Sequence, residues 1–218
     1  MASEWNLKTT KMKEKKLEKT KKILQEIKML YVLGLLIVAC FLAGSAHAGT
    51  VLIPVKPRDG EKPDYCAETC IQEAMIYFGK SISQVEINRA GGGDKVQGLW
   101  SDGIETALRT LGVKHEKWRL NNPKYFDYIE TIKQKIDQGF PVLVGVKINP
   151  TKHPNWFCDH FILLVGYTDD SFIFNSPTQR KERSFVQFRD GDRDGSGWTL
   201  TNPFDHFFGV AIKGMSLR

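Results

Sequence analysis

The chain has 218 residues, of which 41% are hydrophobic and 26% charged, a composition that is ordinary for a globular protein and excludes disorder throughout. Its net charge of +6 is unevenly distributed, because residues 1–48 hold nine lysines and four glutamates and leave 22 basic and 21 acidic residues for the remainder. The globular part therefore has no electrostatic reason to bind phosphate, and we expect no nucleic-acid partner.

Residues 1–48 have the order of a secretory signal peptide. A Lys-rich run is followed by an apolar block, and the small residues around Ala46-His47-Ala48 provide a cleavage point. Two alternatives stay open: residues 29–46 remain as an uncleaved N-terminal membrane anchor, or Cys40 is lipidated. Each of them places the chain from Gly49 onward outside the cytoplasm, as an exported periplasmic or extracellular protein that contacts the membrane only through its N-terminal segment.

The exported part begins with an extended arm over residues 49–63, which contains three prolines. One domain follows over residues 64–218. Its first helix is expected from Asp64, which can cap the free N–H groups of the first turn, to Gly79. Apolar residues recur in this stretch at intervals of three and four, which is typical of an amphipathic helix.

The rest of the domain reads as helices followed by strands. The pattern predicts two more helices, at 102–111 and 124–139, then a buried strand at 140–148, a strand pair at 159–167 and 171–177, a second pair at 184–190 and 197–201, and a closing strand at 207–214. Helices that precede antiparallel strands favour an α+β fold over alternating βαβ winding.

Export changes how the cysteines are counted. Without Cys40, the exported chain has Cys66, Cys70 and Cys158, and an odd number in an oxidising compartment leaves at least one free thiol. Cys66 lies in the first helical turn, where unpaired N–H groups lower a thiol pKa and favour the nucleophilic thiolate. A nucleophilic thiol also needs a base. Among the five histidines, His160 opens an apolar strand and is the best placed to reach a cleft.

These segments together resemble a known family. A helix that begins with Cys and ends in two aromatic residues and Gly, the later QGFPVLVGV, and a His-apolar-Gly-Tyr strand followed by a strand ending in Pro are similar to the papain-like cysteine peptidases. The similarity is greatest to the bacteriocin-processing peptidases that cleave double-glycine leaders, and to their stand-alone relatives. It covers Asp64 to Pro177 and implies a papain-like fold, with the nucleophile-bearing helix packed on an antiparallel sheet.

The resemblance also implies catalytic residues. Cys66 matches the nucleophile and His160 the general base. The third member of the triad is expected to be Asn175, with Ser176 as the alternative. The family spacing from the His falls on Ser176, and because neighbouring strand residues point to opposite faces, Asn175 can orient the imidazole only if a bulge or a shorter hairpin turn shifts the register. The family has a Gln about six residues before the nucleophile that helps to hold the oxyanion, whereas this chain has Gly60 there. Backbone N–H groups at the start of the helix are then left to stabilise the developing charge.

Two further sites are considered. If Cys66 meets His160, then Cys70 and Cys158 are expected to be close enough for a disulfide between helix and strand. The alternatives are a Cys66–Cys70 pair or three buried thiols. In addition, Asp190, Asp192 and Asp194 fit the first half of a calcium loop, although Thr201 stands where the bidentate Glu belongs.

The sequence thus predicts an exported cysteine peptidase that cleaves a peptide or protein substrate through a covalent acyl-enzyme and needs no cofactor. Three alternatives remain. The first is a papain-like scaffold or binding protein with weak or no turnover, and the second is a cell-wall amidase or transpeptidase on the same fold. A metal site is the third, disfavoured because the chain has neither a Cys-x-x-Cys pair nor a close histidine cluster.

Overall fold

The structure is a computed structural model that describes residues 49–94, 96–121, 124–156, 158–176, 178–191, 197–200 and 206–215, together with Gln25. Gly49–Arg218 forms one compact unit and Met1–Ala48 another. The predicted signal peptide or anchor therefore lies almost entirely outside the described residues. Within the described ranges, no helix combines the length and the apolar character needed to cross a membrane.

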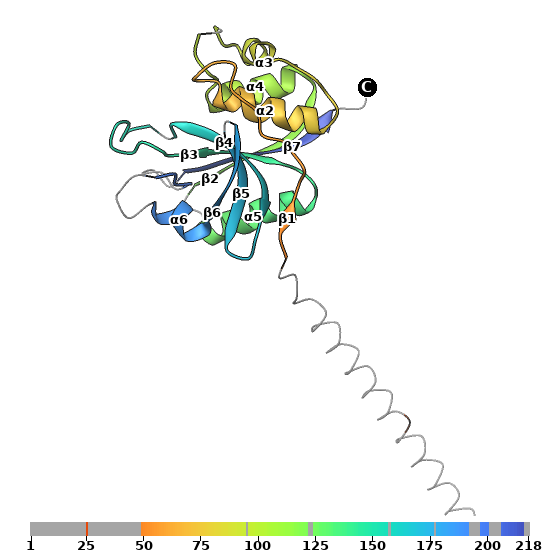
Figure 1. Cartoon of the computed structure of the whole chain (residues 1–218), viewed down its shortest axis with the longest axis vertical. Helices are drawn as coiled ribbons and strands as arrows, with labels where there is room; N and C mark the ends of the chain where they lie inside the picture. The colour runs from red at the N-terminus through yellow and green to blue at the C-terminus, as the bar shows by residue number, and fades with distance from the viewer. Residues whose placement is uncertain are drawn as a thin grey trace, which may run out of the picture. The chain divides into compact units, whose positions relative to one another are not determined.

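An antiparallel sheet forms the centre of the domain (Figure 1). Its central strands are apolar and buried, as expected for strands covered on both faces. The two edge strands, β2 and β6, are rich in charged residues, which discourage pairing with another chain. The strand order is β2 (Val113–Asn121), β7 (His206–Met215), β3 (Val142–Val146), β4 (His160–Tyr167), β5 (Ser171–Ser176) and β6 (Gln179–Ser184), and the short β1 (Val51–Leu52) pairs with β4.

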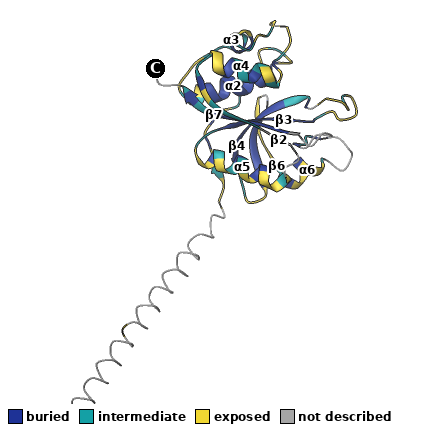
Figure 2. Ribbon diagram, turned by 180° about the vertical axis from the view of Figure 1, so that it is seen from behind, coloured by how far each residue is buried: buried dark blue, intermediate teal, exposed yellow. Residues whose placement is uncertain are grey.

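Helices cover both faces of the sheet. Figure 1 shows α2 (Cys66–Tyr77), α3 (Gln84–Ala90) and α4 (Ser101–Thr110) on one side and α5 (Tyr125–Asp137) and α6 (Phe185–Asp190) on the other. Most of α2 is buried (Figure 2), including three polar residues that lie off its apolar stripe, namely Glu68, Gln72 and Glu73. These side chains remain buried because each is hydrogen-bonded to a neighbouring segment.

The predicted α+β fold, with the helix that contains Cys66 packed on an antiparallel sheet, is confirmed. The prediction of a strand at 184–190 is wrong, because this stretch forms α6. Ser184 and Gln187 make a capping box there, in which each side chain satisfies a backbone N–H at the start of the helix. The strand predicted at 197–201 is also not observed in its described residues. Thr199 makes only an isolated β-bridge with Lys147. The sequence analysis also missed α3, β2 and β6.

The arm before α2 is held in place by buried side chains from three elements. Glu73 accepts a hydrogen bond from the Arg58 backbone N–H at 2.7 Å, and the Gln84 side chain donates to the Asp59 carbonyl at 2.8 Å. The Asn175 amide donates to the Val55 carbonyl at 3.2 Å. The arm is therefore a fixed part of the domain, and its last residues reach the start of α2 in one defined path.

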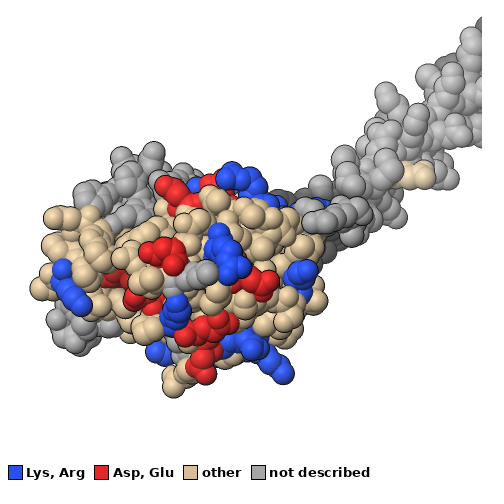
Figure 3. Space-filling model, turned by 90° about the horizontal axis from the view of Figure 1, so that it is seen from above, with Lys and Arg blue, Asp and Glu red and all other residues tan. Residues whose placement is uncertain are grey.

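Charged side chains of both signs are mixed on the face shown in Figure 3. Charged side chains of the domain also form ion pairs: Glu116, for example, lies 2.8 Å from Lys135 and 2.7 Å from Lys213. This face has no large area of a single sign, in agreement with the near balance of charges after residue 48.

Candidate active site

Cys66 is the first residue of α2. The residue at the N-cap position is Tyr65, not the predicted Asp64, and no side chain caps the helix. Cys66 as a residue is half-buried, and its thiol accepts a hydrogen bond from the backbone N–H of Phe161, while the N–H of Ala67 also favours the thiolate form. Because Phe161 directly follows His160, this contact ties the first turn of α2 to the start of β4.

His160 is the first residue of β4 and pairs with Val146 of β3. Its ring packs edge-on against Trp198, with ring centroids 5.4 Å apart, and the Lys181 ammonium lies 5.1 Å above the same Trp198 ring. No hydrogen bond joins the His160 ring to any residue that the structure describes. Trp198 therefore orients the imidazole by packing, a role that the sequence analysis missed.

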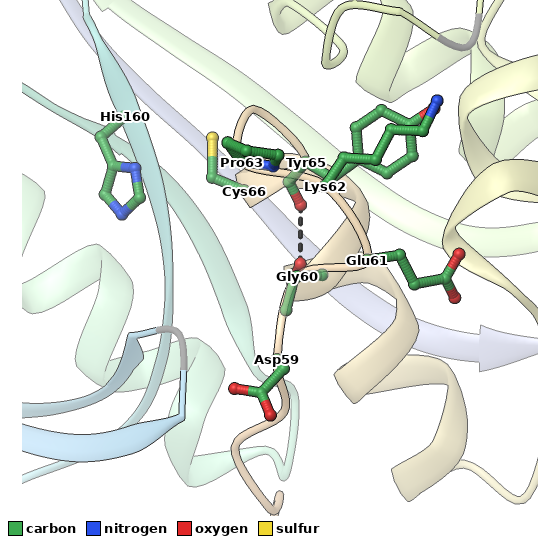
Figure 4. Close-up of a pocket in the computed structure, with 9 residues that line it drawn as sticks. Asp59, Gly60, Glu61, Lys62, Pro63, Tyr65, Cys66 and His160 are labelled. Atoms are coloured by element: carbon green, nitrogen blue, oxygen red, sulfur yellow. Dashed lines mark hydrogen bonds between the residues drawn. The ribbon is translucent and has the colours of Figure 1, made fainter.

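Cys66 and His160 line one pocket of about 410 Å³. The last residues of the arm, 59–63, form much of its wall, and Figure 4 shows the Cys66 sulfur and the His160 ring beside each other at this pocket. The Asp59 carboxylate points to the same side of the arm as His160, whereas the Glu61 side chain points away. The structure thus brings together the two residues predicted as nucleophile and base, which lie 94 positions apart in the sequence.

Burial controls the protonation of both groups. It raises the pKa of the Cys66 thiol to about 11, with a smaller contribution from the nearby Glu68, and outweighs the backbone N–H groups that lower it. The helix N-terminus therefore does not produce the lowered pKa that the sequence predicted. Burial also lowers the pKa of His160 to about 4. At neutral pH the pair is a neutral thiol beside a neutral imidazole.

Neither candidate for the third catalytic position is hydrogen-bonded to His160. Asn175 pairs with Leu163, three residues from His160 along β4, so Asn175 and His160 point to opposite faces of the sheet. The β-bulge on β4, between Leu164 and Gly166, lies on the turn side of this pair and shifts the register by one residue, which places Asn175 opposite Leu163 and not opposite Leu164. Ser176, the next residue, points to the face of His160 and is buried.

Asn175 instead connects α2 to the arm. Its amide donates to the Glu73 carboxylate at 3.0 Å as well as to the Val55 carbonyl. Arg180 contacts both the Asn175 side-chain oxygen and the Val55 carbonyl. Burial raises the pKa of Glu73 to about 7, against the lowering effect of these hydrogen bonds. The structure therefore places Asn175 in a buried polar network that anchors the arm.

The predicted disulfide between Cys70 and Cys158 is not formed in the structure: none of the three cysteines of the described domain is disulfide-bonded. The prediction assumed that Cys158 lies on the same strand face as His160, but β4 begins only at His160. Cys158 precedes the strand and lies close enough to Tyr128 of α5 to affect its pKa. The Cys158 sulfur packs against Gly145 of β3, 3.1 Å from the position where a Cβ atom would lie.

The predicted calcium ligands cannot be assembled from the described residues. Asp190 ends α6 and pairs with Arg189 at 2.7 Å, and Asp192 and Asp194 lie outside the described residues. Among the described side chains, no group of three His, Cys, Asp or Glu residues is arranged to hold a metal ion.

Gly60 lies in the pocket wall. It occupies the position at which the family that the sequence resembles has an oxyanion-binding Gln. A Cβ atom at this position would lie 3.0 Å from the Lys62 carbonyl oxygen and 3.5 Å from the Thr69 hydroxyl. The pocket therefore lacks a side-chain donor at this point. The backbone N–H groups at the start of α2 remain as donors near the thiol.

A glycine allows the loop before α4 to approach the start of α2. A Cβ atom on Gly98 would lie 1.8 Å from the Asp64 carbonyl oxygen, which neither backbone can accommodate without moving. We expect Gly98→Ala to lower the free energy of unfolding by about 1–3 kcal/mol, measured by urea denaturation. Gly49→Ala is the matched control, because no atom lies within 4 Å of its Cβ position. Equal stability of the two variants would contradict this close approach.

Comparison with known proteins gives consistent results. Residues 52–191 match the model of the Peptidase_C39 like family. Two solved structures share the fold. The peptidase domain of Streptococcus ComA, a bi-functional ABC transporter involved in a quorum sensing pathway, has a TM-score of 0.50 and 17% identity, over 73% of this chain and 99% of that one. A Bacillus anthracis protein named as a C39-like peptidase has a TM-score of 0.52 and 13% identity, over 78% and 100%. A sequence search of curated proteins finds no match.

Proposed function

Because the chain belongs to the peptidase C39-like family, a family of cysteine-type peptidases, we propose that it hydrolyses peptide bonds with Cys66 as nucleophile and His160 as general base. The observation that carries this proposal is the shared pocket of about 410 Å³, which both Cys66 and His160 line.

The proposed reaction starts from a neutral pair. The substrate carbonyl enters the pocket, His160 removes the thiol proton as the sulfur attacks, and the imidazolium then donates this proton to the leaving amine. A water molecule, activated by the neutral imidazole, hydrolyses the thioester and releases Cys66. A His160 pKa of about 4 keeps the base unprotonated at neutral pH, and backbone N–H groups at the start of α2 stabilise the oxyanion.

Digestion of a defined peptide mixture by the full chain, with the products identified by mass spectrometry, tests this function. New peptide termini that depend on the Cys66 thiol support the proposal. If the full chain cleaves no peptide but releases ammonia or an amine from cell-wall fragments, an amidase on the same fold replaces it. Absence of any acyl transfer leaves the family fold as a binding scaffold.

The proposed protonation states predict how Cys66 reacts with iodoacetamide. A thiol with a raised pKa has little thiolate at neutral pH, so we expect the alkylation rate to rise about tenfold per pH unit from pH 6 to 9, without a plateau. Stopped reactions analysed by mass spectrometry give the rate at Cys66, with the buried Cys70 as an internal control. Fast alkylation that is independent of pH between 5 and 8 would show a thiolate–imidazolium pair instead.

A further inference from the structure

Two tryptophans form an exposed aromatic pair on the described domain. Trp100, at the N-cap of α4, is 53% exposed, and Trp156, in the loop between β3 and β4, is 43% exposed. Their rings meet edge to face, with centroids 5.4 Å apart and an interplanar angle of 83°. His153 stacks on Trp156 at 3.9 Å. Large aromatic side chains are usually buried, so an exposed pair in mutual contact marks a candidate binding surface.

The loop that carries Trp156 is held by two buried charged residues. The Lys147 ammonium donates to the backbone carbonyls of His153 and Trp156, the second at 3.0 Å. The Asp159 carboxylate accepts from the backbone N–H groups of Ile148 and Asn149 at 2.6 and 2.8 Å. Lys147 and Asp159 are themselves only 2% exposed and lie 4.0 Å apart. The buried Lys147 and Asp159 side chains hold the backbone at both ends of this loop, and this fixes the position of Trp156.

The segment before Trp100 is held in a similar way. The Glu68 carboxylate, buried in α2, accepts from the Leu99 backbone N–H at 2.9 Å and from the Asn88 amide at 2.7 Å. The Asn88 amide also donates to the Gln97 carbonyl at 2.8 Å. Glu68, which belongs to the same helix as Cys66, thereby fixes the segment that leads into Trp100.

Both tryptophans lie in segments that contact or lead into the elements carrying Cys66 and His160. Trp100 directly follows Leu99, which is bound to Glu68, two residues after Cys66. Trp156 is four residues before His160 on the sheet side. The aromatic pair therefore joins two segments: the one before α4, where the Cβ position of Gly98 meets the Asp64 carbonyl beside the start of α2, and the loop that leads into β4.

We propose that Trp100 and Trp156 form a subsite that binds a large apolar side chain of the substrate, a step that rests on the peptidase function proposed above. An edge-to-face pair leaves ring surface free for a third apolar group, and rigid aromatic rings bind with little loss of conformational freedom. A large apolar side chain covers more of this ring surface than a cationic one, whose charged end stays in water.

The test measures binding without turnover. Fluorescein-labelled decapeptides that carry Phe, Ala or Lys at one position at a time are titrated with the full-length Cys66→Ala variant, and binding is followed by fluorescence anisotropy. At one position we expect Phe to bind roughly 10–100-fold more tightly than Ala or Lys. Adding Trp100→Ala or Trp156→Ala removes this preference, whereas Trp→Phe at either position retains most of it.

Phe126→Ala is the matched control, because Phe126 is 56% exposed and belongs to α5 on the opposite face of the sheet. Thermal melting of each variant shows that it is folded. A Phe preference that survives both Trp→Ala substitutions, a preference for Lys, or no preference overturns the subsite. Since binding is measured without Cys66, failure of hydrolysis in the wild-type protein would overturn the proposed function and leave this test intact.

Discussion

Replacing Cys66 by alanine is expected to lower kcat for peptide cleavage by roughly 10⁴-fold or more, because removal of a nucleophile or its base eliminates covalent catalysis and leaves only binding and oxyanion stabilisation. His160→Ala should have an effect of similar size. The two residues act in the same step, so the double variant is expected to be no slower than either single variant. Initial rates of cleavage of one fluorogenic peptide, at saturating concentration, measure all three.

Cys70→Ala is the matched control for Cys66→Ala. Cys70 is one turn along the same helix and is buried in the core, so its removal costs packing and leaves the pocket unchanged. We expect Cys70→Ala to retain kcat within about threefold, as expected for a substitution that changes stability but not the reacting groups. Full turnover in Cys66→Ala, with the protein folded by circular dichroism, would eliminate Cys66 as the nucleophile.

Asn175→Ala is expected to reduce the free energy of unfolding by about 1–3 kcal/mol, because it leaves the buried Glu73 carboxylate without its amide donor. For a domain of this size, that corresponds to a fall in Tm of roughly 2–12 °C. Differential scanning calorimetry at pH 7 measures it. Because Asn175 contacts Glu73 and the arm and not Cys66, the alkylation rate of Cys66 should change little.

Ser176→Ala separates the two candidates for the third catalytic position. Ser176 lies on the face of His160, and no hydrogen bond to another described residue depends on its hydroxyl. We therefore expect Ser176→Ala to be nearly as stable as the wild type and to lower kcat by at most about tenfold, within the range of a weak orienting contact. A large loss of kcat in Asn175→Ala at unchanged Tm would instead assign the orienting role to Asn175.

The sequence was sufficient for elements whose residues form a clear apolar pattern. The helices containing Cys66 and Tyr128, and the apolar strands β3, β4, β5 and β7, were predicted close to their observed bounds. Strands β2 and β6 were missed because their residues are largely charged, and only their places at the sheet edges explain this composition. Both missed helices, α3 and α6, begin with a capping box, Ser83 with Glu86 and Ser184 with Gln187, and this signal was available in the sequence.

The site was predictable where it depended on order along the chain, and less so where it depended on register or burial. Cys66 and His160 were selected because one begins a helix and the other begins a strand. Asn175 was expected near His160, but a register that places it opposite Leu163 cannot be obtained from sequence alone. The Cys66 pKa was predicted in the wrong direction, because the helix N-terminus is visible in a sequence and the extent of burial is not.

The anchoring of the arm has a consequence for the timing of folding. The pocket wall at residues 59–63 depends on a path fixed by Asn175 and Arg180, more than a hundred positions later in the chain. Contacts this distant in sequence form late, and a chain still on the ribosome lacks them altogether. A nascent chain that has not yet reached β5 and β6 therefore has a cysteine but no completed pocket. The pocket proposed as the active site would therefore be complete only when nearly the whole domain has been synthesised.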